Sequence, residues 1–101
     1  MNYTENFEGI KLDVQAGDID ISNEVQQEIR DAIGRLARHV SKVNFVDVYF
    51  TDKSDKSTDT KNVGIRIGVP GSDAYASDSG DNWMELLSSV EEKLRRQLER
   101  K

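Results

Sequence analysis

The C-terminal segment 93–101 concentrates positive charge in an otherwise acidic chain. It holds five basic side chains and one acidic one, whereas the formal net charge of all 101 residues is −5. Clustered Lys and Arg side chains bind polyanions, because a polyanion responds to the local potential rather than to the net charge. The first chemistry that the sequence suggests is therefore contact with nucleic-acid phosphates, and the alternative is a solvated helix face.

Helical spacing arranges the basic residues in two rows. Apolar residues recur every three or four positions from Val25 to Val43, which predicts an amphipathic helix over 24–41. A second apolar stripe, starting at Trp83, predicts a closing helix capped by Asp81 or Asn82. One basic row lies opposite the first stripe and the other lies beside the second. The rows are Arg35, Arg38 and Lys42 on the first helix and Lys93, Arg96 and Arg100 on the second.

Residue types for catalysis and metal binding are scarce. The chain has one histidine, His39, and no cysteine, so neither a nucleophile–base pair nor a zinc site can be assembled from the usual residues. Segment 18–29 lacks the glycine and the final glutamate of a calcium loop, and the glycines compose no phosphate-binding loop. We expect no enzyme activity, no cofactor, no metal and no small-molecule substrate.

Three aromatic residues, Phe45, Tyr49 and Tyr75, with Arg66 nearby, suggest a further binding surface. Aromatic rings on an open sheet can stack on unpaired bases. The alternative is that these residues only cover the sheet, and we favour it because Asp47 lies in the same row.

The apolar pattern predicts an α+β fold of order β-α-β-β-β-α. The four-stranded sheet is expected to carry both helices on one face, with its first two strands parallel and the rest joined by hairpins. The predicted strands are 10–15, 43–51, 63–69 and 74–78. Segment 1–9 is predicted to be a flexible N-terminus, 10–101 a single domain, and 52–62 a mobile hairpin loop. No segment approaches the ~20 apolar residues of a membrane span, and no secretory signal opens the chain, so a cytoplasmic protein is expected.

The last third of the sequence resembles the ribosome hibernation-promoting factor and ribosome-associated inhibitor family, also known as sigma-54 modulation proteins. The final strand of that family carries a His-Ala-Ser-like stretch, and its closing helix carries Lys-Leu-x-x-Gln-Leu followed by basic residues. The matching residues here are Ala74-Tyr75-Ala76-Ser77, Gly80, Lys93-Leu94, Arg96-Gln97-Leu98 and Arg100-Lys101. The resemblance extends upstream to about residue 10, and it is to the short, single-domain members of the family. The predicted order of elements agrees with the fold of that family.

This resemblance implies a stress or stationary-phase factor that inhibits translation by docking on the small ribosomal subunit. The implied partner is ribosomal RNA, contacted mainly at phosphates and sugars, and the expected state in solution is a monomer. Combining the family positions with the helical rows gives the predicted RNA-binding residues Arg35, Arg38, Lys42, Lys93, Arg96, Gln97, Arg100 and Lys101.

The rival hypothesis is a protein-interaction or regulatory module on the same scaffold that has lost RNA binding. Electrostatics discriminates between the two. Basic rows that merge into one patch favour RNA, whereas carboxylates such as Glu92 and Glu99 that interrupt the rows favour the rival.

Overall fold

The computed structural model describes residues 1–53 and 61–100. The tip of the predicted hairpin loop and Lys101 lie outside the described residues. In chain order the elements are β1 (Asn2–Phe7), β2 (Ile10–Gln15), α1 (Asn23–Ala37), β3 (Phe45–Asp52), β4 (Lys61–Val69), β5 (Ser72–Gly80) and α2 (Trp83–Glu99).

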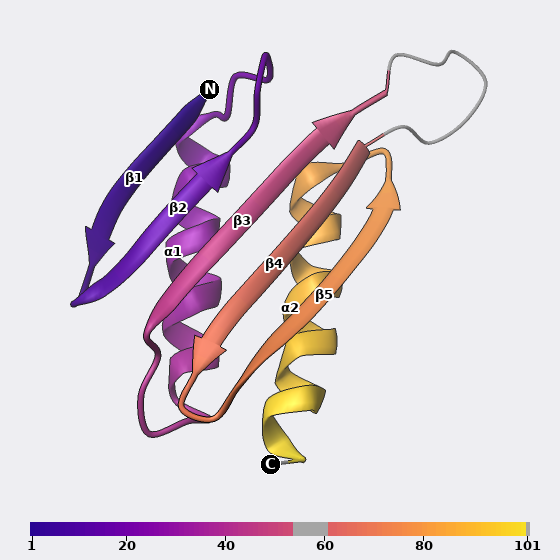
Figure 1. Cartoon of the computed structure of the whole chain (residues 1–101). Helices are drawn as coiled ribbons and strands as arrows, with labels where there is room; N and C mark the ends of the chain where they lie inside the picture. The colour runs from indigo at the N-terminus through magenta and orange to yellow at the C-terminus, as the bar shows by residue number, and fades with distance from the viewer. Residues whose placement is uncertain (54–60, 101) are drawn as a thin grey trace.

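The strands form one sheet in the order β1-β2-β3-β4-β5, and both helices pack on the same face of it (Figure 1). β2 and β3 pair in parallel across the α1 crossover, and every other neighbouring pair is antiparallel. The predicted α+β class with two helices is therefore confirmed, while the predicted count of four strands is wrong by one.

The additional strand is β1, in the segment for which the sequence predicts a flexible N-terminus. Tyr3, Glu5 and Phe7 alternate with exposed residues, and the two aromatic rings pack on the edge of the core. Glu8 and Gly9 both have positive φ, 52° and 86°, as a two-residue type I′ turn requires. A tight hairpin thus pairs β1 with β2.

Each helix begins at a side-chain cap and buries one apolar stripe. The Ser22 hydroxyl accepts a hydrogen bond from the Val25 amide, and the Asn82 side chain accepts one from the Glu85 amide. α1 ends at Ala37, four residues before the predicted end, because the next amides bond to carbonyls three residues back. Val40 continues the apolar periodicity of the sequence and is half-buried, but it lies in the turn after α1 and not in the helix. In the described chain, no helix has the length and apolar character needed to cross a membrane.

The two helices run parallel to each other, so their C-termini lie at the same end of the molecule (Figure 1). α1 follows β2 and α2 follows β5, and the pairing makes these two strands parallel in direction. Arg35 of α1 bonds to Glu91 of α2. His39, two residues after the end of α1, lies 3.7 Å from Glu99 at the end of α2. The ends of both predicted basic rows therefore lie at one end of the fold.

Candidate nucleic-acid interface

Arg35 joins α1 to α2 instead of projecting freely into solvent. Its guanidinium donates to both carboxylate oxygens of Glu91 at 2.8 Å and to Glu28 at 2.8 Å. The hydrogen bond to Glu91 is the main cause that raises the pKa of Arg35. Two carboxylates surround one cation, so the Arg35 charge is largely neutralised within the protein.

Arg38 and Lys42 lie beyond the last turn of α1, so the predicted row is not a straight ridge on a helix. Arg38 is the C-cap residue, and Lys42 lies in the segment that leads to β3. Both side chains are exposed, and neither forms an ion pair with any residue in 1–53 or 61–100. These two cations remain available to a ligand.

In the α2 row, Lys93 is held by contacts within the protein, whereas Arg96 and Arg100 are more accessible to solvent. Lys93 donates to the Ser77 carbonyl at 3.0 Å and lies 3.7 Å from Asp78. The side chain of Arg96 is 63% exposed and pairs with Glu92 at 3.4 Å. Arg100 is exposed and has no ion pair within the described part of the chain.

Carboxylates do interrupt the basic surface of α2. Arg95 bonds to Glu92 and to Glu99, which flank it by three and four residues. The hydrogen bond from Arg95 is the largest cause that lowers the pKa of Glu92. The positive charge of 93–101 is consequently divided between internal ion pairs and the free cations near the helix end.

The Gln97 side chain bonds to the backbone at the outer edge of β5. Its amide donates to the Tyr75 carbonyl at 2.8 Å and accepts from the Tyr75 amide at 3.3 Å. Lys93 reaches Ser77, two residues along the strand. Four helical residues advance about 6 Å and two strand residues about 6.6 Å, so the Lys-x-x-x-Gln spacing matches the strand.

Replacing Gln97 should therefore loosen β5. We expect Gln97→Ala to lower the free energy of unfolding by about 1 to 2 kcal/mol, because two hydrogen bonds are lost. The Tyr75 amide should also exchange its hydrogen faster in NMR experiments. Arg96→Ala is the matched control, with a stability change within about 0.5 kcal/mol. Unchanged exchange at Tyr75 in Gln97→Ala would contradict the edge contact.

The cations that retain accessible charge lie in or after the last turn of each helix, at the end of the fold where both helices terminate. We call these four residues, Arg38, Lys42, Arg96 and Arg100, the basic pole. A shallow groove of about 270 Å³ lies at the same end, between the segment after α1, the β4–β5 turn and the end of α2. It is lined by His39, Val40, Ser41, Val69, Pro70 and Leu98.

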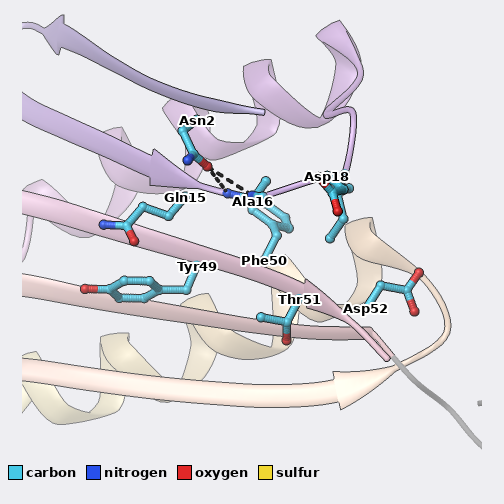
Figure 2. A pocket seen from close by; sticks show the side chains of 10 residues that line it. Asn2, Gln15, Ala16, Asp18, Tyr49, Phe50, Thr51 and Asp52 are labelled. Carbon is cyan, nitrogen blue, oxygen red and sulfur yellow. Dashed lines mark hydrogen bonds between the residues drawn. The ribbon is translucent and has the colours of Figure 1, made fainter. Parts of the chain in front are cut away.

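A second hollow, of about 480 Å³, lies at the opposite end of the sheet, where β2 and β3 finish (Figure 2). The Asn2 side chain there accepts hydrogen bonds from the Ala16 and Gly17 amides, which ties β1 to the turn after β2. Its titratable lining groups are Asp18, Asp52 and Tyr49, without a histidine or cysteine. Among the described residues no cluster of His, Cys, Asp or Glu has a metal-binding arrangement. The titratable side chains that line this hollow are therefore two carboxylates and one phenol.

Residues 12–101 match the protein family described as "Sigma 54 modulation protein / S30EA ribosomal protein". A curated relative, the ribosome hibernation promoting factor of Acinetobacter guillouiae, is 23% identical over 97 residues, covering 90% of this chain and 86% of the relative.

Two solved structures share the fold. The N-terminal domain of Thermus thermophilus Protein Y superposes with a TM-score of 0.73 at 12% identity, covering 86% of this chain and 92% of that one. A ribosomal subunit interface protein from Coxiella burnetii superposes with a TM-score of 0.67 at 18% identity, covering 88% of this chain and 93% of that one.

Proposed function

Because the chain belongs to the sigma 54 modulation protein / S30EA ribosomal protein family, we propose that it is a ribosome hibernation factor. Such a factor associates with ribosomes in the cytoplasm and inhibits translation. The name of the curated relative, a ribosome hibernation promoting factor, supports this role. The family is non-enzymatic, which confirms the expectation that the chain is not an enzyme.

The proposed partner is ribosomal RNA of the small subunit, and the proposed contact is the basic pole. The observation that carries this proposal is that Arg38, Lys42 and Arg100 all lie at one end of the fold without an ion pair to a described residue. Free cations can replace the counterions of RNA phosphates without first breaking an internal salt bridge. Lys101, outside the described residues, follows Arg100 directly and belongs to the proposed contact.

Three other residues from the predicted set have structural partners. Arg35 and Lys93 hold neighbouring elements together, and Gln97 bonds to the backbone of β5. We propose that these three support the fold of the interface, while the basic pole touches the phosphates and sugars. Recognition then rests on the shape of the RNA more than on its base sequence.

One observation favours the rival function, a protein-interaction or regulatory module. Glu92 and Glu99 lie within the α2 row and neutralise Arg95, which weakens the attraction of this surface to RNA. The rival is therefore a second candidate function.

Co-sedimentation of the purified protein with small subunits in sucrose gradients tests the proposal. Binding should weaken as salt is raised, because each phosphate contact contributes roughly −0.7 to −0.9 to the log–log slope. Four contacts from the basic pole predict a slope of about −3. Affinity that does not change between low and physiological ionic strength would exclude this electrostatic mechanism, and absence of co-sedimentation at low salt would favour the rival.

A further inference from the structure

The face of the sheet opposite the helices has no covering element in the described chain (Figure 1). Phe45, Tyr49 and Tyr75 project from it, because their strand neighbours Val46, Val48 and Ala74 are buried on the helix side. Tyr75 has 43% of its surface exposed. Three aromatic side chains therefore lie on a sheet face that no helix of the described chain covers.

Two glycines of β4 let the Phe45 and Tyr75 rings lie close to the sheet backbone. A methyl group at Gly68 would stand 2.1 Å from the Phe45 ring, and one at Gly64 would stand 2.6 Å from the Tyr75 hydroxyl. Both glycines are buried although no helix covers them, since the rings lie over them. The alternation Gly64-x-Arg66-x-Gly68 thus gives the Phe45 and Tyr75 rings room close to the β4 backbone.

Arg66 shows how an arginine side chain can lie on this face. Its guanidinium lies 5.1 Å from the centroid of the Tyr75 ring and 3.8 Å from the Asp73 carboxylate. A single arginine thereby stacks on an aromatic face and pairs with an acid at the same time. The geometry is that of an arginine bound by a tyrosine and an aspartate.

A second acid on this face has no such partner. Asp47 lies opposite Arg66 in the β3–β4 register, but Arg66 pairs with Asp73 instead. On its other side Asp47 lies opposite Asp13, whose carboxylate accepts from Thr4 and Gln15. Like charges directly opposite in a sheet are destabilising. Within the described chain, no ion pair or hydrogen bond reaches the Asp47 side chain.

We propose that the uncovered sheet face docks a basic polypeptide segment. Three acids, Asp13, Asp47 and Asp73, outnumber the two bases on this face, Lys11 and Arg66. An arginine of the partner would stack on Tyr49 or Phe45 and pair with Asp47, as Arg66 already does with Tyr75 and Asp73. Single-stranded RNA fits less well, because these carboxylates repel its phosphates. The proposal concerns the face opposite the helices and does not depend on ribosome binding.

Fluorescence anisotropy with two labelled probes tests the proposal. The probes are a synthetic (Arg-Gly-Gly)4 peptide and a 12-nucleotide oligouridine RNA, each titrated with the intact protein. We expect the peptide to bind more tightly than the RNA. Asp47→Asn should weaken peptide binding about tenfold by removing the unpaired acid. Tyr75→Ala should weaken it as well, whereas Tyr75→Phe should retain binding because the ring persists.

Asp81→Asn is the matched control, since it removes an exposed negative charge that lies off the sheet face, next to the start of α2. Equal losses in Asp47→Asn and Asp81→Asn would mean that the peptide senses only net charge, which overturns the proposal. Tighter binding of the RNA, or absence of peptide binding, overturns it too. Amide chemical-shift changes on titration with peptide should map to β3, β4 and β5, and changes confined to the helices would contradict the assigned face.

Discussion

Reversing the three unpaired cations of the basic pole, in Arg38→Glu, Lys42→Glu and Arg100→Glu combined, is expected to abolish association with small ribosomal subunits. Each charged hydrogen bond contributes about 1.5 kcal/mol, and each 1.4 kcal/mol is about a tenfold change in affinity. The combined variant should therefore bind roughly a thousandfold more weakly in co-sedimentation, and inhibition of cell-free translation should be lost with it.

The fold should survive these substitutions, because none of the three side chains is buried or holds another element. Glutamate near a helix C-terminus is disfavoured by roughly 0.3 to 1 kcal/mol per residue, which a stable domain tolerates. Lys53→Glu is the matched single reversal, at an exposed position beyond the opposite end of β3. If the folded triple variant still inhibits translation like the parent, the result would contradict RNA binding through the basic pole and favour the protein-interaction module.

Truncation of the largest fully buried side chain, in Phe50→Ala, is expected to have the largest effect on stability. Phe50 is 2% exposed, and its ring meets the Trp83 ring edge-on at 5.2 Å. Loss of a buried Phe side chain costs about 3 to 5 kcal/mol. For a domain of this size the melting temperature should fall by about 15 °C or more, measured by circular dichroism.

A double-mutant cycle isolates the aromatic contact in that loss. Trp83 is only half-buried, so Trp83→Ala should cost less than Phe50→Ala. The coupling between the two substitutions should be about 0.5 to 1.5 kcal/mol, the usual range for an aromatic pair. Phe50→Leu is the control that keeps most of the apolar volume. A coupling of zero would place the origin of the Phe50 effect elsewhere in the core.

Periodicity predicted most of this fold because the core is built from regular stripes. In β2 and over 45–50 of β3, buried residues alternate with half-buried or exposed ones, and in the helices the buried residues recur every three or four positions. β1 escaped prediction because its inward positions are only half-buried and include Glu5, whose carboxylate pairs with Arg30 of α1. The sequence signal that indicates β1 is the alternation of Tyr3, Glu5 and Phe7 with polar residues, followed by the turn residues Glu8 and Gly9.

The candidate site was harder to predict, because ion pairing depends on tertiary packing. The sequence identifies where Arg35 faces on its helix, but Glu91 is 56 residues away and meets it only when α1 packs beside α2. Likewise, Gln97 matched a family motif without revealing what it touches. Its role follows only from knowing that β5 lies at the edge of the sheet. Sequence therefore located the charges, and packing decided which remain free.

The unequal edges of the sheet limit how copies of this protein can polymerise. β5 offers Tyr75 and Ser77 to side chains of α2, whereas no side chain from the described residues of another element bonds along the outer edge of β1. A strand from another molecule would therefore meet fewer occupied backbone groups at β1 than at β5. If two copies met at β1 about a two-fold axis, both outer margins of the joined sheet would be β5 strands whose Tyr75 and Ser77 backbone groups already bond to α2, which disfavours the addition of a third copy.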